Sequence, residues 1–323
     1  MSKERKMRNL IDLKSPNVNL VLSSLLKDRT TGKNIIFATE ISDDIHFTTN
    51  ITKDLLLKDN RIDIRPRVSK SMEEQVKRTR KKAEVFTPSW ICNKMNNHCD
   101  TEFFGRENVF NIEDGQKWIS NDEKIEFPAG KTWKDYVESK RLEITCGEAP
   151  YLVSRYDTVT GEIIPIHQRI GLLDRKLRVI NENVTTYKTW IQWVYRAFES
   201  VYGYEYQGDN LLIARINLLE TFCEYMRDRW QEEPNKTSLN RIADIISWNL
   251  WQMDGIYGVI PYEGAVYVQE EEEESHQMTL FEIYGIAGEA EPEPEAELPE
   301  TIDCKIYDWD ENKIITYKSM REE

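Results

Sequence analysis

A short stretch in the middle of the chain, residues 141–147, decides the fold class; it reads Arg-Leu-Glu-Ile-Thr-Cys-Gly. The first four residues have the composition of a short apolar strand, and the Thr-Cys-Gly that follows ends it in a turn. A second strand with an acidic end is expected at residues 200–205. Long segments with apolar residues at helical spacing separate the strands. This alternation predicts an α/β protein with a mainly parallel sheet.

Several further elements are expected around these strands. The clearest helix is an amphipathic one over residues 210–230, with Leu211, Ala214, Leu218, Phe222 and Tyr225 on one face. Pro88 and Ser89 are typical of a helix start. The remaining expectations are a short helix at 18–26, a charged helix at 71–82, helix over 165–200, an apolar segment at 242–251 and a hairpin at 302–317.

Length and composition exclude several classes of protein. The chain has 323 residues, of which 40% are hydrophobic, so it can bury a sizeable core. It contains no run of about 18 apolar residues, which predicts no membrane span. The charged start, Met-Ser-Lys-Glu-Arg-Lys, does not resemble a secretory signal. The five cysteines include no Cys-x-x-Cys pair, so we expect no disulfide framework and no metal site. This use of cysteine is typical of a reducing compartment, and we expect a cytoplasmic protein.

Charge is segregated along the chain and indicates its organisation. Residues 262–323 hold 19 acidic and 4 basic side chains, whereas residues 1–82 hold 19 basic and 11 acidic ones. We therefore expect a small mixed, basic N-terminal segment (1–80), a cofactor-binding domain (81–262), a disordered acidic insert (263–300) and a C-terminal hairpin that continues the domain (301–323). The net charge of −14 does not exclude nucleic acid as a partner.

Four segments occur in an order that carries a family resemblance. Residues 84–91 contain Phe-Thr-Pro, residues 142–152 contain the strand and turn with Cys-Gly, residues 202–205 end in Glu, and residues 251–255 contain Asp-Gly. In this order the chain, over roughly residues 80–260, resembles adenine-N6 DNA methyltransferases of restriction–modification systems. The resemblance implies a Rossmann-like sheet with helices on both faces, S-adenosylmethionine as the cofactor, and double-stranded DNA as the substrate.

The resemblance also assigns roles to individual residues at the carboxyl ends of the strands, where such folds bind nucleotides. Glu143 would bind the methionine ammonium, Glu205 the ribose hydroxyls, and Asp254 the adenine amino group. Gly147 would let the backbone approach the cofactor without a Cβ in the way. The full set of implied cofactor-binding residues is Phe86, Thr87, Pro88, Glu143, Cys146, Gly147, Glu205 and Asp254.

The chain departs from the family pattern in two respects. Glu143 stands where the family usually has Asp, and Ala149 replaces the second glycine of the turn. No Asn-Pro-Pro-Tyr motif, which places the flipped adenine in this family, is found, so the catalytic residues are unknown. Ile-Pro-Tyr at 260–262 lacks the polar residue and the second proline. Two interpretations stay open. In the first, the chain is part of a split or truncated methyltransferase, and its partner is a second chain that carries the missing motif or a restriction subunit. In the second, it is a non-catalytic subunit that binds DNA or a partner protein.

Each segment taken alone also has a structural interpretation. Cys-Gly at 146–147 and Asp-Gly at 254–255 are common turns, Glu205 is typical of a solvated strand end, and Phe86 of a core residue. His98 beside Cys99 lacks the second pair of ligands that a zinc site needs. Only the order of the four segments favours the methyltransferase interpretation.

A cluster of positive charge is the candidate DNA contact. It falls within residues 65–82, and its predicted contacts are Arg65, Arg67, Lys77, Arg78, Lys81 and Lys82. Such a cluster is suited to the phosphate backbone. The alternative is a solvated helix face, because the order of acidic residues first and basic residues last also suits the helix dipole.

Overall fold

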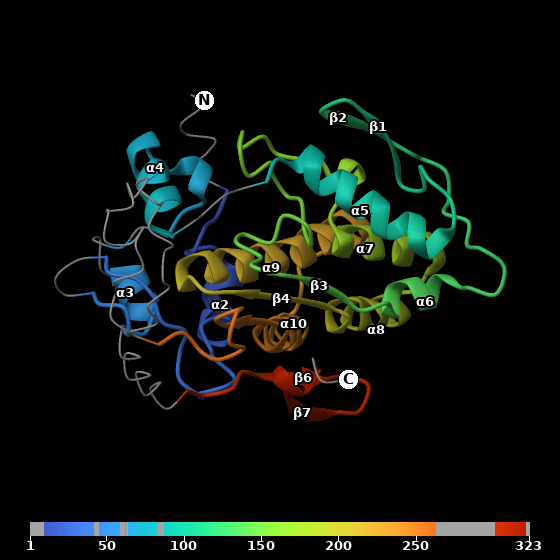
Figure 1. Cartoon of the computed structure of the whole chain (residues 1–323). Helices are drawn as coiled ribbons and strands as arrows, with labels where there is room; N and C mark the ends of the chain where they lie inside the picture. Colours follow the sequence, from blue (N-terminus) through green and yellow to red (C-terminus); the bar gives the residue numbers. More distant parts are fainter. Residues whose placement is uncertain are drawn as a thin grey trace, which may run out of the picture.

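The computed structural model describes residues 10–41, 45–58, 62, 64–82, 87–262 and 301–320, without the side chains of residue 77 and residues 79–82. Figure 1 shows the arrangement. The elements are α2 (Pro16–Leu25), α3 (Lys53–Lys58), η1 (Arg67–Ser69), α4 (Met72–Lys82), α5 (Ser89–Phe104), β1 (Asn111–Asp114), β2 (Lys117–Ser120), α6 (Trp133–Glu138), β3 (Arg141–Glu143), η2 (Ile166–Gln168), α7 (Leu172–Asn183), α8 (Tyr187–Glu199), β4 (Val201–Glu205), α9 (Gly208–Trp230), α10 (Lys236–Asn249), β5 (Leu250–Gln252), β6 (Lys305–Asp308), β7 (Lys313–Thr316) and η3 (Lys318–Met320).

A parallel sheet of three short strands lies at the centre of the molecule. The strands are ordered β3-β4-β5, so neighbours in the sheet are also neighbours in the chain. Glu143 pairs with Gly203, and Glu205 pairs with Gln252. Figure 1 shows β3 and β4 crossing the centre, with α5 above them and the β6–β7 hairpin below. The predicted parallel α/β arrangement is confirmed, although the sheet is small.

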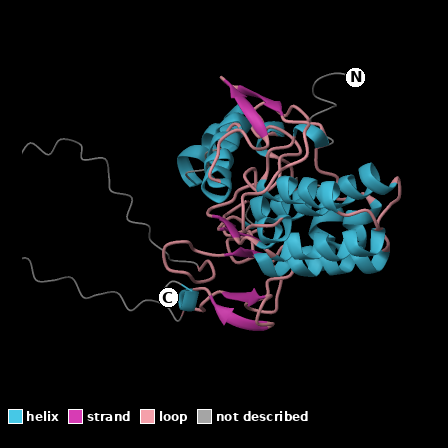
Figure 2. Ribbon diagram, turned by 90° about the vertical axis from the view of Figure 1, so that its right-hand side faces the viewer, coloured by secondary structure: helices cyan, strands magenta, loops and turns pink. Residues whose placement is uncertain are grey.

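Two helices connect each pair of neighbouring strands. Helices α7 and α8 lead from β3 to β4, and α9 and α10 lead from β4 to β5. Helices α8, α9 and α10 all contact the sheet, where Val201 and Leu250 are completely buried. Figure 2 shows the long helices stacked together on one side of the central strands. The single helix expected over 165–200 is two helices, α7 and α8, in the structure. Thr186 marks the start of the second one, since its side chain accepts a hydrogen bond from the Thr189 N–H.

The opposite face of the sheet is covered differently from the sequence expectation. Tyr204 and Trp251 on this face pack with Cys304 and Ile306 in a separate apolar cluster. This cover comes from the β6–β7 hairpin, which confirms the predicted hairpin but replaces a helix. In the described part of the chain, the expectation of helices on both faces is therefore not met.

Helix α9 is the central helix of the fold. The sequence predicted an amphipathic helix here, but α9 is buried on most sides. Both its predicted apolar face and much of its polar face are buried, including Arg215, Asn217 and Thr221. The reason is that α2, α7 and α10 surround it together with the sheet. Arg215 donates hydrogen bonds to the carbonyls of Leu25, Lys27, Ser247 and Leu250, and burial lowers the pKa of its guanidinium to about 9.

The N-terminal segment shares the core of the central domain. Val18, Leu22 and Leu25 of α2 are buried in the same cluster as the helices around the sheet. Ser15 starts α2 by accepting a hydrogen bond from Val18 N–H. Helix α2 thus packs against α9 and α10, and the buried described residues of the N-terminal segment belong to the same core as the central domain.

Candidate functional site

A cavity of about 430 Å³ opens where β3 ends. Its walls come from β3, from the turn after it, and from one side of α5. The cavity brings together four of the residues that the sequence singled out, namely Thr87, Glu143, Cys146 and Gly147. Its other lining residues are Met95, Asn96, Cys99, Leu142, Ile144, Thr145, Glu148, Pro150, Tyr151 and Leu172.

The turn that follows β3 has an unusual backbone. Thr145, Gly147 and Ala149 all have positive φ, of 46°, 53° and 63°. Only glycine adopts this left-handed region without a steric cost, so Thr145 and Ala149 are strained by about 1 kcal/mol or more each. The turn is held by hydrogen bonds from Cys146 N–H to the Tyr204 carbonyl (2.8 Å) and from Ala149 N–H to the Cys146 carbonyl (2.7 Å). Strain of this kind is typical of functional sites.

Glu143 ends β3 and points into the protein. Its two carboxylate oxygens accept hydrogen bonds from the N–H groups of Tyr151 (3.3 Å) and Leu152 (3.0 Å). Burial raises the pKa of Glu143 to about 8. The two hydrogen bonds lower this pKa by less than burial raises it, and the charge of Glu205 raises it further. Glu143 therefore shapes the cavity by holding the chain that runs from the turn to Leu152.

Glu205 ends the neighbouring strand and is bound to the same turn. One of its oxygens accepts a hydrogen bond from Gly147 N–H (2.8 Å), and the other accepts one from Gln207 N–H (3.0 Å). Glu205 is not among the residues that line the cavity, but it fixes the glycine that does. The parallel register thus places two carboxylates beside one turn.

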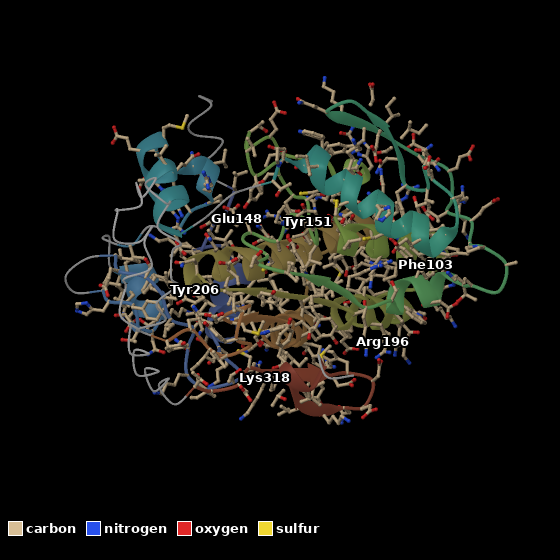
Figure 3. The ribbon with its side chains drawn as sticks, in the orientation of Figure 1. Phe103, Glu148, Tyr151, Arg196, Tyr206 and Lys318 are labelled. Carbon is tan, nitrogen blue, oxygen red and sulfur yellow. The ribbon has the colours of Figure 1, made fainter. Side chains whose placement is uncertain are left out.

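The cavity wall has two carboxyl side chains and no basic side chain among its described residues. Glu143 and Glu148 are its ionisable carboxyl groups, and no Lys, Arg or His lines it within the described ranges. The Glu148 carboxylate accepts hydrogen bonds from Arg67 N–H (2.7 Å) and the Tyr156 hydroxyl (2.6 Å). Figure 3 shows Glu148 and Tyr151 at the centre of the molecule, below α4 and α5. Such a wall suits a ligand that is cationic or rich in hydrogen-bond donors.

Helix α5 forms the wall opposite the turn, and few features of the sequence indicate this role. Pro88 precedes the helix and Ser89 begins it, as predicted. The family resemblance implies that Thr87 and its neighbouring backbone meet the methionine carboxylate near the start of α5. In the structure, Asp157 already accepts a hydrogen bond from Ser89 N–H at this helix start (2.7 Å). Burial opposes ionisation of Asp157, yet its hydrogen bonds prevail and lower its pKa. Met95, Asn96 and Cys99 lie on the cavity side of α5, and only their helical spacing could have linked them.

Among the predicted cofactor residues, Asp254 lies apart from the cavity wall. Asp254 is buried two residues beyond β5, where its carboxylate accepts hydrogen bonds from the N–H groups of Ile256 and Tyr257 and so stabilises a turn. Cys146 lines the cavity as a buried thiol whose pKa burial raises well above its ordinary value, so it is no nucleophile. Phe86 lies outside the described residues.

The predicted DNA-binding residues make several contacts within the protein. Arg78 on α4 pairs with Asp209 at the start of α9 (2.7 Å), and Lys70 lies 3.6 Å from the same carboxylate. Arg65 pairs with Glu74 at 3.2 Å. Arg67 reaches the cavity turn through its backbone, as described above. The side chains of Lys77, Lys81 and Lys82 lie outside the described part, so the DNA contact stays a prediction.

The described residues contain no group of three or more His, Cys, Asp and Glu side chains placed to hold a metal ion. None of the helices within those ranges has both the length and the hydrophobicity needed to cross a bilayer. Comparisons with protein-family models, with curated proteins and with solved structures found no match. The geometry of the cavity is therefore the basis for a functional proposal.

Proposed function

We propose that the chain binds S-adenosylmethionine in this cavity and is the cofactor-binding part of an adenine-N6 DNA methyltransferase. The observation that supports the proposal most is the placement of Glu143 and Glu205 at the ends of adjacent parallel strands, both hydrogen-bonded around one strained turn that lines the cavity. Ligands of nucleotide type bind at this edge of parallel sheets. The order of the four sequence segments adds independent support.

The chemistry of the wall fits this cofactor. S-adenosylmethionine carries a sulfonium and an ammonium cation, and the wall offers carboxylates without a competing basic side chain. Glu143 would hold the ammonium, and Gly147 would let the backbone approach the ligand because it has no Cβ. Glu205 would accept hydrogen bonds from the ribose hydroxyl groups. When bound, the cofactor supplies an electrophilic methyl group.

The proposal places the acceptor base outside this chain. Because no Asn-Pro-Pro-Tyr motif is found, the pocket for the extruded adenine would come from a second polypeptide of a split restriction–modification methyltransferase. The chain would then contribute the cofactor and phosphate contacts from the α4 region. The partners in this proposal are double-stranded DNA and that second polypeptide, in the cytoplasm.

Titration calorimetry with S-adenosylmethionine tests the proposal. We expect one site in the wild type and an affinity lower by about 1.5–3 kcal/mol in Glu205→Ala, because the variant loses a charged acceptor and the anchor of Gly147. Glu199→Ala is the matched control, since Glu199 is also buried but lies at the opposite end of β4 and pairs with Arg196 and Arg241. A folded wild type that binds no cofactor at millimolar concentration would contradict the proposal.

A second candidate function is a non-catalytic subunit that binds a partner protein. It is favoured by the outer edge of the sheet, where β3 pairs with β4 alone among the described strands. Leu142 and Ile144 at this edge are 45% and 63% exposed, although parallel sheets are usually buried. A methylation assay with tritiated cofactor on mixed-sequence DNA separates the two functions, because only the first predicts label transfer once the partner is added.

A further inference from the structure

Asn96 lies in the cavity wall on the second turn of α5 and is 1% exposed. Its side-chain Nδ2 donates hydrogen bonds to the carbonyl of Tyr151 (3.0 Å) and to the carbonyl of Ile170 (2.9 Å). These two bonds join α5 to the end of the cavity turn and to the residue pair that precedes α7. Asn96 is thus a buried polar group at the junction of three segments.

The two bonds determine which way the Asn96 amide faces. A side-chain amide has two N–H donors, and carbonyl oxygens accept from both of them here. Reversing the amide would place its oxygen against two carbonyl oxygens, so the orientation is fixed by chemistry. No described residue donates a hydrogen bond to the Asn96 Oδ1. Because Asn96 lines the cavity, this oxygen is available to a ligand there.

Asn93 provides the contrast on the same helix. It is also 1% exposed, one turn before Asn96, but it does not line the cavity. Its Nδ2 donates to Asn111 Oδ1 (2.9 Å), and its Oδ1 accepts from Asn111 Nδ2 (2.9 Å) and Arg175 Nη2 (2.8 Å). The protein therefore satisfies the oxygen of one buried asparagine and leaves that of the other to the cavity.

We propose that Asn96 contacts the ligand and that its Oδ1 accepts a hydrogen bond from the ligand's α-ammonium group, beside Glu143. The inference rests on the proposed function, whose cofactor has such a group. Glu143 accepts from Tyr151 N–H while Asn96 donates to the Tyr151 carbonyl, so the two side chains meet at one residue. An ammonium has three donors, and each Glu143 oxygen already takes one backbone N–H. The Asn96 Oδ1 would provide a second acceptor for the ammonium beside Glu143.

The test compares two ligands on the wild type, Asn96→Ala and Asn93→Ala. S-adenosylmethionine carries the ammonium, whereas 5′-methylthioadenosine has the same nucleoside and lacks the amino-acid end. We expect Asn96→Ala to weaken S-adenosylmethionine about tenfold or more, as for a hydrogen bond to a charged donor, and to leave methylthioadenosine within about twofold. Asn93→Ala should lower the melting temperature without changing the ratio of the two affinities. Asn96→Ser takes the place of Asn96→Ala should the latter fail to fold.

The outcomes separate this inference from the proposed function. Equal weakening of both ligands by Asn96→Ala would show a purely structural role and overturn the inference, as would unchanged binding of S-adenosylmethionine. In either case the wild type still binds the cofactor, and the proposed function stands. A folded wild type that binds neither ligand overturns both.

Discussion

At the scale of single residues, Glu143 combines a structural duty with a proposed ligand contact. It is buried at the end of an edge strand and holds the N–H groups of Tyr151 and Leu152. Burial is the largest influence on its pKa, which rises to about 8. The folded protein therefore binds a proton at Glu143 over a pH range in which the unfolded chain, with an ordinary glutamate pKa of about 4.3, has released it.

This difference predicts how stability depends on pH. A carboxyl group with a raised folded-state pKa stabilises the fold at pH below its unfolded pKa, and the contribution is lost as pH rises through the folded value. We expect the free energy of unfolding to fall by on the order of 3 kcal/mol between pH 5 and pH 8.5, and Glu143→Gln to flatten this slope. Urea denaturation across this range measures it. The control is Glu113→Gln on the exposed part of β1, which should keep the wild-type slope. A flat wild-type profile would contradict the raised pKa.

At the scale of elements, another segment of the chain passes very close to the start of α9. The carbonyl oxygen of Ile36 lies 1.9 Å from the position that a Cβ on Gly208 would occupy. Gly208 N–H also donates to the Phe37 carbonyl (3.3 Å). The first turn of α9, the central helix, is thus built against the extended chain at residues 36–37, and a glycine is needed there for space.

We therefore expect Gly208→Ala to destabilise the fold by about 1–3 kcal/mol, as overpacking does, although alanine favours helices. Lys236→Ala is the matched control, because Lys236 is the exposed first residue of α10. It should change the free energy of unfolding by less than about 0.5 kcal/mol. Thermal and urea unfolding of both variants measure the difference. A stabilised Gly208→Ala protein would mean that residues 36–37 do not pass this close to α9.

At the scale of the whole molecule, the N-terminal segment is joined to the cavity and to the central helix. Arg67 N–H binds the carboxylate of Glu148 in the cavity turn, and Arg78 and Lys70 lie around Asp209 at the start of α9. The side chains of Arg78 and Asp209 are only 15% and 9% exposed. The segment that the sequence marked for DNA binding is therefore also part of the support of the candidate site.

Arg78 and Lys81 should consequently behave differently. Arg78→Ala removes a partner of the buried Asp209, and we expect it to cost about 2 kcal/mol of stability, less than for an isolated buried pair because Lys70 remains. Lys81→Ala should leave stability unchanged and weaken binding of a mixed-sequence duplex in a salt-dependent way, as the loss of a phosphate contact does. Urea unfolding and fluorescence anisotropy at two salt concentrations measure these effects. Unchanged DNA affinity in Lys81→Ala would instead favour a solvated helix face.

The local features of the fold could be predicted from the amino-acid sequence. The strand and turn at 141–147, the strand end at Glu205, the start of α5 after Pro88 and the hairpin at 302–317 all follow from composition over a few residues. Their order along the chain also predicted a parallel sheet. These predictions held because propensity, turn chemistry and strand order act within a single segment or between successive ones.

The segments that enclose the site are set by the tertiary structure. It buried the polar face of α9, covered one sheet face with a hairpin, placed Asp157 at the start of α5 and Asp209 against Arg78, and turned Asn96 toward the cavity wall. Each of these contacts joins residues that are distant in the sequence. When two contacting side chains are distant in the sequence, neither segment carries a periodic pattern that would reveal the contact. Burial and hydrogen bonding at these positions therefore follow from the packing of the whole chain.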